Sequence, residues 1–94
     1  MRRVNAVIPV ATAVGVAAVE VSASGSNKIW TEVSAGSGNT GTIYLGGHGT
    51  NPTVANGYGE LRTRESIRID GGSSIWAISD AASQEVRVLE GHST

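Results

Sequence analysis

The chain has 94 residues, a formal net charge of −1 and no cysteine, so it is long enough for one small domain and can form no disulfide. Aromatic residues are 4% of the sequence and phenylalanine is absent, so any core must be built mainly from small aliphatic side chains. Basic residues alternate with acidic ones, as in the stretch from Glu60 to Asp70, and this excludes the basic stripe typical of nucleic-acid-binding proteins.

The first 26 residues allow three interpretations. Arg2 and Arg3, a mainly apolar middle and a small-residue end are the parts of a secretory leader, and the alanines of residues 11–21 would suit a helix. Polar or helix-breaking residues interrupt the apolar stretch, however, and no uninterrupted run reaches the roughly 20 residues that a membrane helix needs. We therefore expect no membrane partner and regard this segment as part of the working protein.

Valine content favours strands over a helix in the same segment. Gly15 and five valines between residues 10 and 21 lower its helical preference, and apolar and polar residues alternate towards its end. We predict that residues 3–10 and 14–22 are extended. Together, residues 1–27 are expected to form an N-terminal arm or the edge strands of a sheet.

The rest of the chain reads as strands separated by turns. Alternating or β-rich runs occupy residues 28–35, 42–45, 54–55, 61–70, 74–79 and 85–90. Glycine-rich loops lie between them, and Asn56-Gly57 is a strong hairpin signal. Seven to eight short strands with turn signals every 8–12 residues are typical of an all-β sandwich or barrel. We predict an all-β, single-domain β-sandwich of jelly-roll-like topology, with residues 28–94 as the sandwich domain.

Residues that could carry out catalysis or bind a metal are sparse. His48 lies in a glycine-rich loop and His92 in the C-terminal tail, far from the clustered ligands that a metal site needs. No serine lies in a Gly-x-Ser-x-Gly motif. The carboxylates alternate with apolar residues and are expected to face solvent: Glu60, Glu65, Asp70 and Glu85. We expect no enzymatic activity, no cofactor and no metal.

The two tryptophans are the candidates for core or interface positions. Trp76 is flanked by Ile75, Ala77 and Ile78, so we expect it in the core or in a buried interface. Trp30 lies on the strand face opposite Val33, and one face of each strand in a two-layer sandwich looks outward. Trp30 is therefore the better candidate for contact with a partner.

The order of strand ends and turns over residues 28–90 resembles the small β-rich structural proteins of tailed bacteriophages, namely capsid decoration (cement) proteins, head-fibre bases and related modules. The segments that carry the resemblance are Gly41–Gly46, Gly57–Leu61, Glu65–Ile67, Ile75–Ser79 and Glu85–Glu90. Proteins of this kind often have Pro-Gly ahead of the serine, where this chain has Thr63-Arg64-Glu65.

The resemblance implies a function without catalysis. Decoration proteins form trimers, or less often dimers, on the outside of the shell, and they hold neighbouring major capsid proteins together. It thus implies a virion protein on the outer capsid surface, a homo-oligomer with a trimer favoured, and the major capsid protein as partner. The residues expected to contact partners are Arg2, Arg3, Val4, Val7, Ile8, Trp30, Tyr44 and Tyr58.

A second hypothesis is a carbohydrate-binding adhesin or fibre-tip module of a phage. In this interpretation Trp30, Tyr44 and Tyr58 would stack on sugar rings, while Asn39 and Asn51 would form hydrogen bonds to them. The two hypotheses differ in the chemistry of the partner, a protein shell in one case and a glycan in the other.

Overall fold

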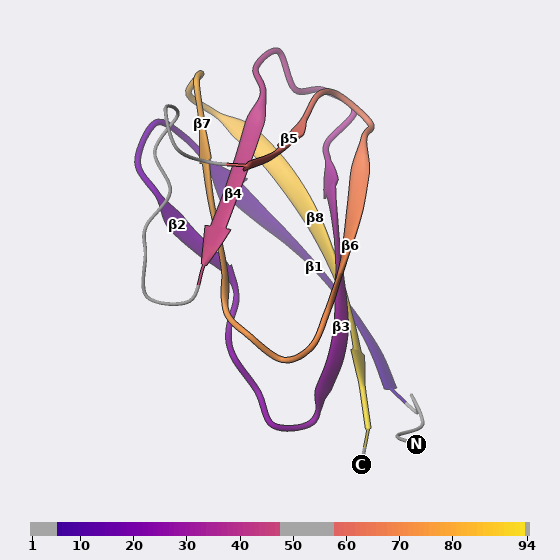
Figure 1. The fold of residues 1–94 in the computed structure, drawn as a ribbon. Coiled ribbons are helices and arrows are strands. Elements are labelled where there is room, and N and C mark those ends of the chain that lie inside the picture. The colour runs from indigo at the N-terminus through magenta and orange to yellow at the C-terminus, as the bar shows by residue number, and fades with distance from the viewer. Residues whose placement is uncertain (1–5, 48–57, 94) are drawn as a thin grey trace.

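A computed structural model describes residues 6–47 and 58–93, and only the backbone of residues 6–9, 58 and 59. Every regular element in this part of the chain is a strand, so the all-β prediction is confirmed (Figure 1). The strands are β1 (Ala6–Val14), β2 (Val19–Ser22), β3 (Lys28–Ala35), β4 (Ile43–Gly47), β5 (Tyr58–Leu61), β6 (Ser66–Asp70), β7 (Ile75–Ser79) and β8 (Gln84–His92).

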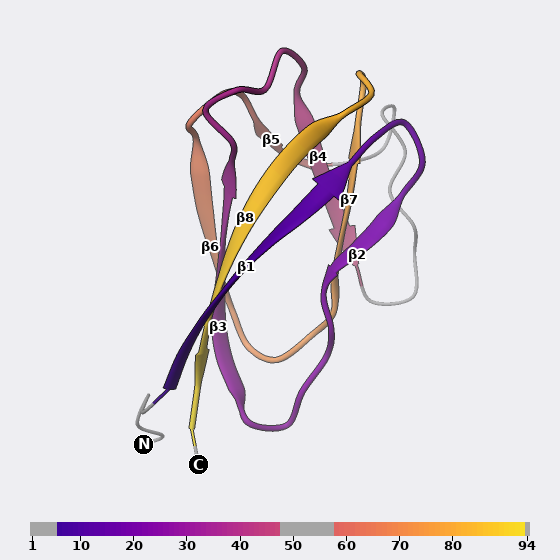
Figure 2. The ribbon, with the colours of Figure 1, turned by 180° about the vertical axis from the view of Figure 1, so that it is seen from behind.

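The strands form two antiparallel sheets of four strands each. Their orders are β1-β8-β3-β6 and β2-β7-β4-β5, and every pairing is antiparallel. Seen from behind, β1 and β8 run side by side along the first sheet (Figure 2). The chain crosses between the sheets after β1, and the Ser79 amide of β7 donates a 2.8 Å hydrogen bond to the Gly15 carbonyl at that crossing.

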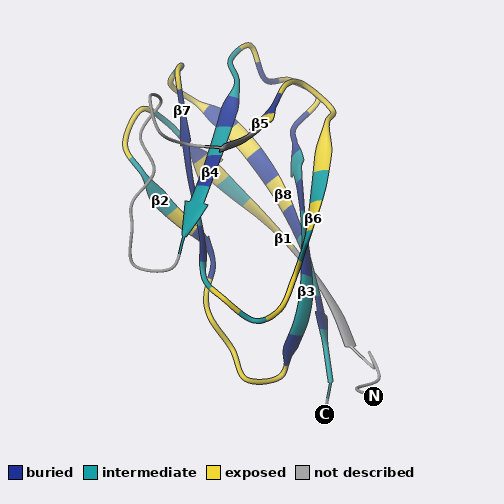
Figure 3. Cartoon of the chain, in the orientation of Figure 1, coloured by how far each residue is buried: buried dark blue, intermediate teal, exposed yellow. Residues whose placement is uncertain are grey.

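Small aliphatic side chains from both sheets fill the space between the two layers. The core residues are Val14, Val21, Val33, Ala35, Ile43, Leu45, Leu61, Ile75, Ala77, Val86 and Val88. The burial of β8 alternates along the strand (Figure 3), as expected where one face of a strand packs on a core and the other faces solvent. Ile67 and Ile69 of β6 also pack against this core. The predicted continuous run at 61–70 is wrong at residues 62–65, which form a turn between β5 and β6.

The start of the chain is extended, but its strands end at positions different from those predicted. A single strand runs from Ala6 to Val14, and β2 begins at Val19. The predicted break at residues 11–13 is wrong, because β8 continues alongside and gives each of these residues a partner in register. The predicted strand at 54–55, the Asn56-Gly57 turn and the predicted extension at 3–5 lie outside the described residues.

Candidate functional site

The outer face of the β1-β8-β3-β6 sheet carries a tryptophan covered by an arginine. Trp30 lies in register between Gly91 of β8 and Asp70 of β6. A side chain at position 91 would overlap the indole ring, so glycine is the residue that lets Trp30 lie flat across β8. The Arg68 guanidinium carbon lies 4.5 Å from the ring centroid, a cation–π geometry that holds the indole in place.

A shallow groove of about 360 Å³ lies on the same sheet, over β1, β8 and β3. Its lining residues are Val10, Ala11, Glu32, Ser34, Arg87, Val88 and Leu89. Glu32 is directly opposite Leu89 on one side and Arg68 on the other, so the groove and the Trp30–Arg68 pair are neighbours on one surface. This surface offers an apolar floor flanked by one acidic and two basic side chains.

The outer face of the β2-β7-β4-β5 sheet carries the other aromatic residues. Trp76 lies in register between Glu20 and Gly46, and Tyr44 lies opposite Ile78. Both aromatic side chains are half-buried. Of the two positions predicted for Trp76, the core is wrong, because Ile75 and Ala77 take the inward positions of β7 and strand alternation turns Trp76 the other way. A buried interface stays a prediction.

The residues predicted to contact partners are spread over the molecule. Arg2, Arg3 and Val4 lie outside the described residues. Val7 and Ile8 lie in β1 and Tyr58 begins β5, and only the backbone of these three residues is described. Trp30 and Tyr44 face outward from different sheets, so the structure does not bring these two aromatic side chains together.

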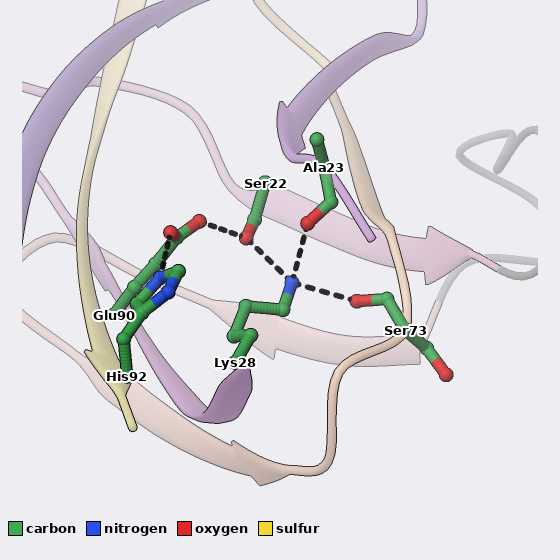
Figure 4. Close-up of polar contacts among 6 residues, drawn as sticks. All are labelled: Ser22, Ala23, Lys28, Ser73, Glu90 and His92. Atoms are coloured by element: carbon green, nitrogen blue, oxygen red, sulfur yellow. Dashed lines mark hydrogen bonds and ion pairs between the residues drawn. The ribbon is translucent and has the colours of Figure 1, made fainter. Parts of the chain in front are cut away.

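A buried polar cluster closes the end of the sandwich at which the described chain begins and ends, and Figure 4 shows it. Lys28 is 2% exposed, and its Nζ donates 2.8 Å hydrogen bonds to the Ser22 hydroxyl, the Ala23 carbonyl and the Ser73 carbonyl. The Ser22 hydroxyl in turn donates a hydrogen bond to Glu90 Oε2. His92 Nε2 lies 2.8 Å from Glu90 Oε1. Ser22 therefore connects a buried ammonium group to a carboxylate.

Burial and partners shift the ionisation of two groups in this cluster. Burial lowers the pKa of Lys28 from its ordinary 10.5, although the negative charges of Glu90 and Glu20 oppose the change. Burial alone would raise the pKa of Glu90. The hydrogen bonds from Ser22 and His92 and the charge of Lys28 outweigh burial, so the pKa of Glu90 lies below its ordinary 4.5. The charged groups and hydrogen bonds of this cluster therefore connect β2, β3 and β8.

Sequence reasoning missed this cluster for an identifiable reason. Strict alternation puts Lys28 on the same face as Trp30, but the register shifts between these two residues, where β3 advances by two positions and β8 by one. This bulge turns Lys28 inward. The placement of His92 in a tail is wrong, since it ends β8. The position of Glu90, two residues beyond Val88, was the available signal.

The remaining polar predictions have mixed outcomes. Glu60, Glu65, Asp70 and Glu85 are exposed, as predicted. Among the described residues no group of three His, Cys, Asp or Glu side chains is placed to hold a metal ion. The same part of the chain contains no helix long and apolar enough to cross a membrane.

Asn39, offered as a sugar ligand, is 9% exposed and bonds to the backbone of Glu85 through both its amide nitrogen and its amide oxygen. The side chain joins the loop after β3 to the start of β8. Its hydrogen-bonding groups are therefore occupied within the fold.

Comparison with known proteins adds no relative: no protein-family model, curated protein or solved structure matches this chain. The resemblance to phage structural proteins stays a prediction from the segments quoted above.

Proposed function

We propose that the two sheets form a jelly roll and that the chain is a capsid decoration protein. The strand orders support the first part. Successive strands β1 to β4 alternate between the sheets, and the later strands pair with them as β1 with β8, β2 with β7, β3 with β6 and β4 with β5. This order agrees with the double Greek-key path expected of an eight-stranded jelly roll. Jelly rolls occur in viral capsid and lectin domains, so the topology suits a shell-associated protein.

The observation that carries the functional proposal is a filled interior combined with an outer sheet face suited to a protein partner. Aliphatic side chains occupy the space between the sheets, and Lys28 is bonded to its neighbours there. Binding by this fold therefore takes place outside the sheets. The groove and the adjacent Trp30–Arg68 pair combine an apolar floor, an aromatic ring and arginine, which are the components that protein interfaces favour.

On this proposal, the protein lies on the outer capsid surface and associates with other copies of itself. Its partner is the major capsid protein. The sheet face with the groove contacts the shell. Attachment that occurs only to the folded protein also stabilises that fold by mass action. Many copies on one shell add avidity without further contacts.

The carbohydrate-binding alternative requires its aromatic and asparagine side chains to lie together in one site. Trp30 and Tyr44 look outward from different sheets, and Asn39 is buried with its amide bonded to the backbone of Glu85. Trp30 and Tyr44 therefore do not form one stacking site with Asn39.

Co-sedimentation tests the proposal. The full chain is mixed with undecorated capsids assembled from the major capsid protein of the phage genome that encodes it, and the mixture is separated on a density gradient. We expect saturable binding at a fixed ratio to the capsid protein. A chain that stays at the top of the gradient at every concentration contradicts the proposal.

A pair of charge reversals locates the surface that binds. Arg87→Glu changes an exposed residue of the groove, whose ion pair with Glu85 is itself exposed and so contributes little to stability. We expect this change to weaken capsid binding by about tenfold or more. Arg62→Glu makes the same charge change at an exposed turn away from the groove and should leave binding unchanged. Equal effects of the two variants would contradict the assignment of the groove.

A further inference from the structure

The four edge strands of the two sheets differ in how well they are protected from pairing with another chain. Exposed edges are normally kept short, charged or bulged, because an open row of backbone donors and acceptors recruits other strands. β2 has four residues, a register shift and Glu20. β5 has four residues, a register shift in its pairing and Glu60. β6 has five residues and carries Arg68 and Asp70. These three edges are guarded.

β1 has none of these protections except a proline. It is nine residues long, contains no charged residue and pairs with β8 at every position without a register shift. No other described strand lies along its free edge. It is therefore the strand of this molecule best suited to pairing with a further strand.

Exposed apolar side chains lie on β1 and in the segment that follows it. Val10 is 45% exposed and Val16 is 67% exposed, and these are the large hydrophobic residues that the described surface leaves open. Ala11, Ala13 and Ala17 beside them are exposed as well. An apolar edge with exposed valines indicates an interface.

Pro9 indicates which backbone groups of β1 face outward. Alternate residues of an antiparallel strand direct their backbone groups to one neighbour, and the residues between them to the other. Proline has no N–H and is tolerated where that group would face away from the paired strand. Residues 7, 9, 11 and 13 therefore face the free edge. Val7, Ala11 and Ala13 offer both a donor and an acceptor, and Pro9 offers an acceptor.

We propose that the β1 strands of two copies of this chain pair antiparallel about a twofold axis at Val10. This register overlaps all nine residues of each strand. It brings Val7 opposite Ala13 of the second copy, and Pro9 opposite Ala11, where the proline carbonyl accepts a hydrogen bond. The two Val10 side chains meet at the axis and cover each other. We assign the free edge of β1 to a second copy of the chain, because the β1 strand of that copy has the same length and the same lack of charge. The other edge strands, β2, β5 and β6, are shorter and carry charged residues.

The pairing joins two four-stranded sheets into one continuous sheet, and the twofold axis stands perpendicular to it. The grooves of both copies then lie on the same side of that sheet. On the proposed function, one dimer would present two contact surfaces to a single shell. The pairing does not depend on the capsid role, and its tests use the purified chain alone.

Native mass measurement tests the association. The full chain should be a dimer that dissociates on dilution, and Val10→Lys should raise the dimer dissociation constant by about tenfold or more, because two like charges would meet at the axis. Ser66→Lys places the same charge on the exposed β6 edge of the same sheet and should leave the dimer intact. A monomer or a trimer at all concentrations overturns the β1 pairing, as does equal weakening by both variants.

Cysteine crosslinking tests the register, since the chain has no native cysteine. Val10→Cys places two thiols across the axis, within the Cα separation that a disulfide spans. Ala13→Cys is the control on the same strand, and its two copies would be about 20 Å apart. We expect a disulfide-linked dimer from Val10→Cys and none from Ala13→Cys under mild oxidation. Crosslinking at 13 but not at 10, or equal slow crosslinking at both, overturns the register.

Discussion

Ser22 links the buried ammonium group of Lys28 to the half-buried carboxylate of Glu90. Its hydroxyl accepts a hydrogen bond from Lys28 and donates one to Glu90, so it supplies each charged group with a partner. A buried ammonium group without such partners would be strongly destabilising. The Ser22 hydroxyl is therefore one of three oxygens that hold the Lys28 ammonium group in this small core.

Ser22→Ala should lower the free energy of unfolding by about 1–3 kcal/mol, because it leaves both Lys28 and Glu90 short of one hydrogen bond. Urea unfolding at neutral pH measures the change. Ser24→Ala, at an exposed position two residues on, is the matched control and should change stability little. If the two variants unfold at the same urea concentration, the relay contributes nothing to stability.

The hydroxyl of Thr31, unlike that of Ser22, is buried without a hydrogen-bond partner. It is fully buried in β3, in register with Glu90 and Ile69, and its hydroxyl oxygen has no hydrogen-bond partner. An unsatisfied buried hydroxyl costs stability, whereas an apolar group of the same shape does not.

Thr31→Val should therefore leave stability unchanged or raise the unfolding free energy by up to about 2 kcal/mol. The midpoint of thermal unfolding reports the difference. Thr42→Val is a comparison at a half-buried threonine outside the core. A loss of stability in Thr31→Val larger than that in Thr42→Val would mean that the Thr31 hydroxyl forms a stabilising contact in solution.

Alternation predicted β3 and β8 well, because each of these strands buries one face and exposes the other. Val33 and Val88 point inward, and Trp30 lies on the opposite face of β3 from Val33. The sequence carries this information locally, since side-chain direction has a period of two along a strand. Alternation predicted the direction of side chains in β6 but not where that strand begins, because residues 62–65 turn.

The features that alternation could not predict depend on neighbouring strands. The bulge at Ile29 that turns Lys28 inward arises from the pairing of β3 with β8, and the length of β1 follows from the length of β8 beside it. The direction of Trp76 depends on which face of β7 packs on the core. These are properties of register, and no short window of sequence contains them.

The Trp30 ring lies against the β8 backbone at Gly91, so substitution of Gly91 tests the position of this ring on the outer sheet face. Gly91→Ala must displace the indole and should lower the unfolding free energy by about 1–3 kcal/mol. It should also shift tryptophan fluorescence to longer wavelength as the ring becomes more exposed.

Gly38→Ala is the control for this change, because a Cβ there meets no atom. It should leave both the emission wavelength and the stability close to those of the parent chain. An unchanged spectrum in Gly91→Ala would show that Trp30 does not lie across β8 in solution.

For the whole molecule, the polar cluster makes stability depend on pH. The pKa of Glu90 is lower in the folded chain than its ordinary 4.5, so its contribution is fully present above 4.5 and is lost as the pH falls through the folded pKa. The pKa of Lys28 is lowered from 10.5, so its contribution makes the fold more stable as the pH rises towards 10.5. Glu20 also acts on Lys28 through its charge, and Ser22 and His92 form hydrogen bonds with Glu90.

Glu90→Gln should therefore cost about 3 kcal/mol at neutral pH, because Lys28 loses its nearby anion. The difference between Glu90→Gln and the parent chain should shrink as the pH falls below 4.5. Unfolding measured from pH 7 to acid conditions checks this. Glu60→Gln, at an exposed residue, is the control. A difference for Glu90→Gln that stays constant with pH contradicts the assignment.

We propose that this small, filled sandwich acts by attaching to a larger protein shell, the capsid. Calorimetric melting of the capsid, with and without a saturating amount of the full chain, tests this proposal. Binding only to the intact shell stabilises it by mass action, so the capsid transition should move to higher temperature and saturate with added protein. A capsid transition that stays at the same temperature at every ratio of protein to capsid would contradict the account.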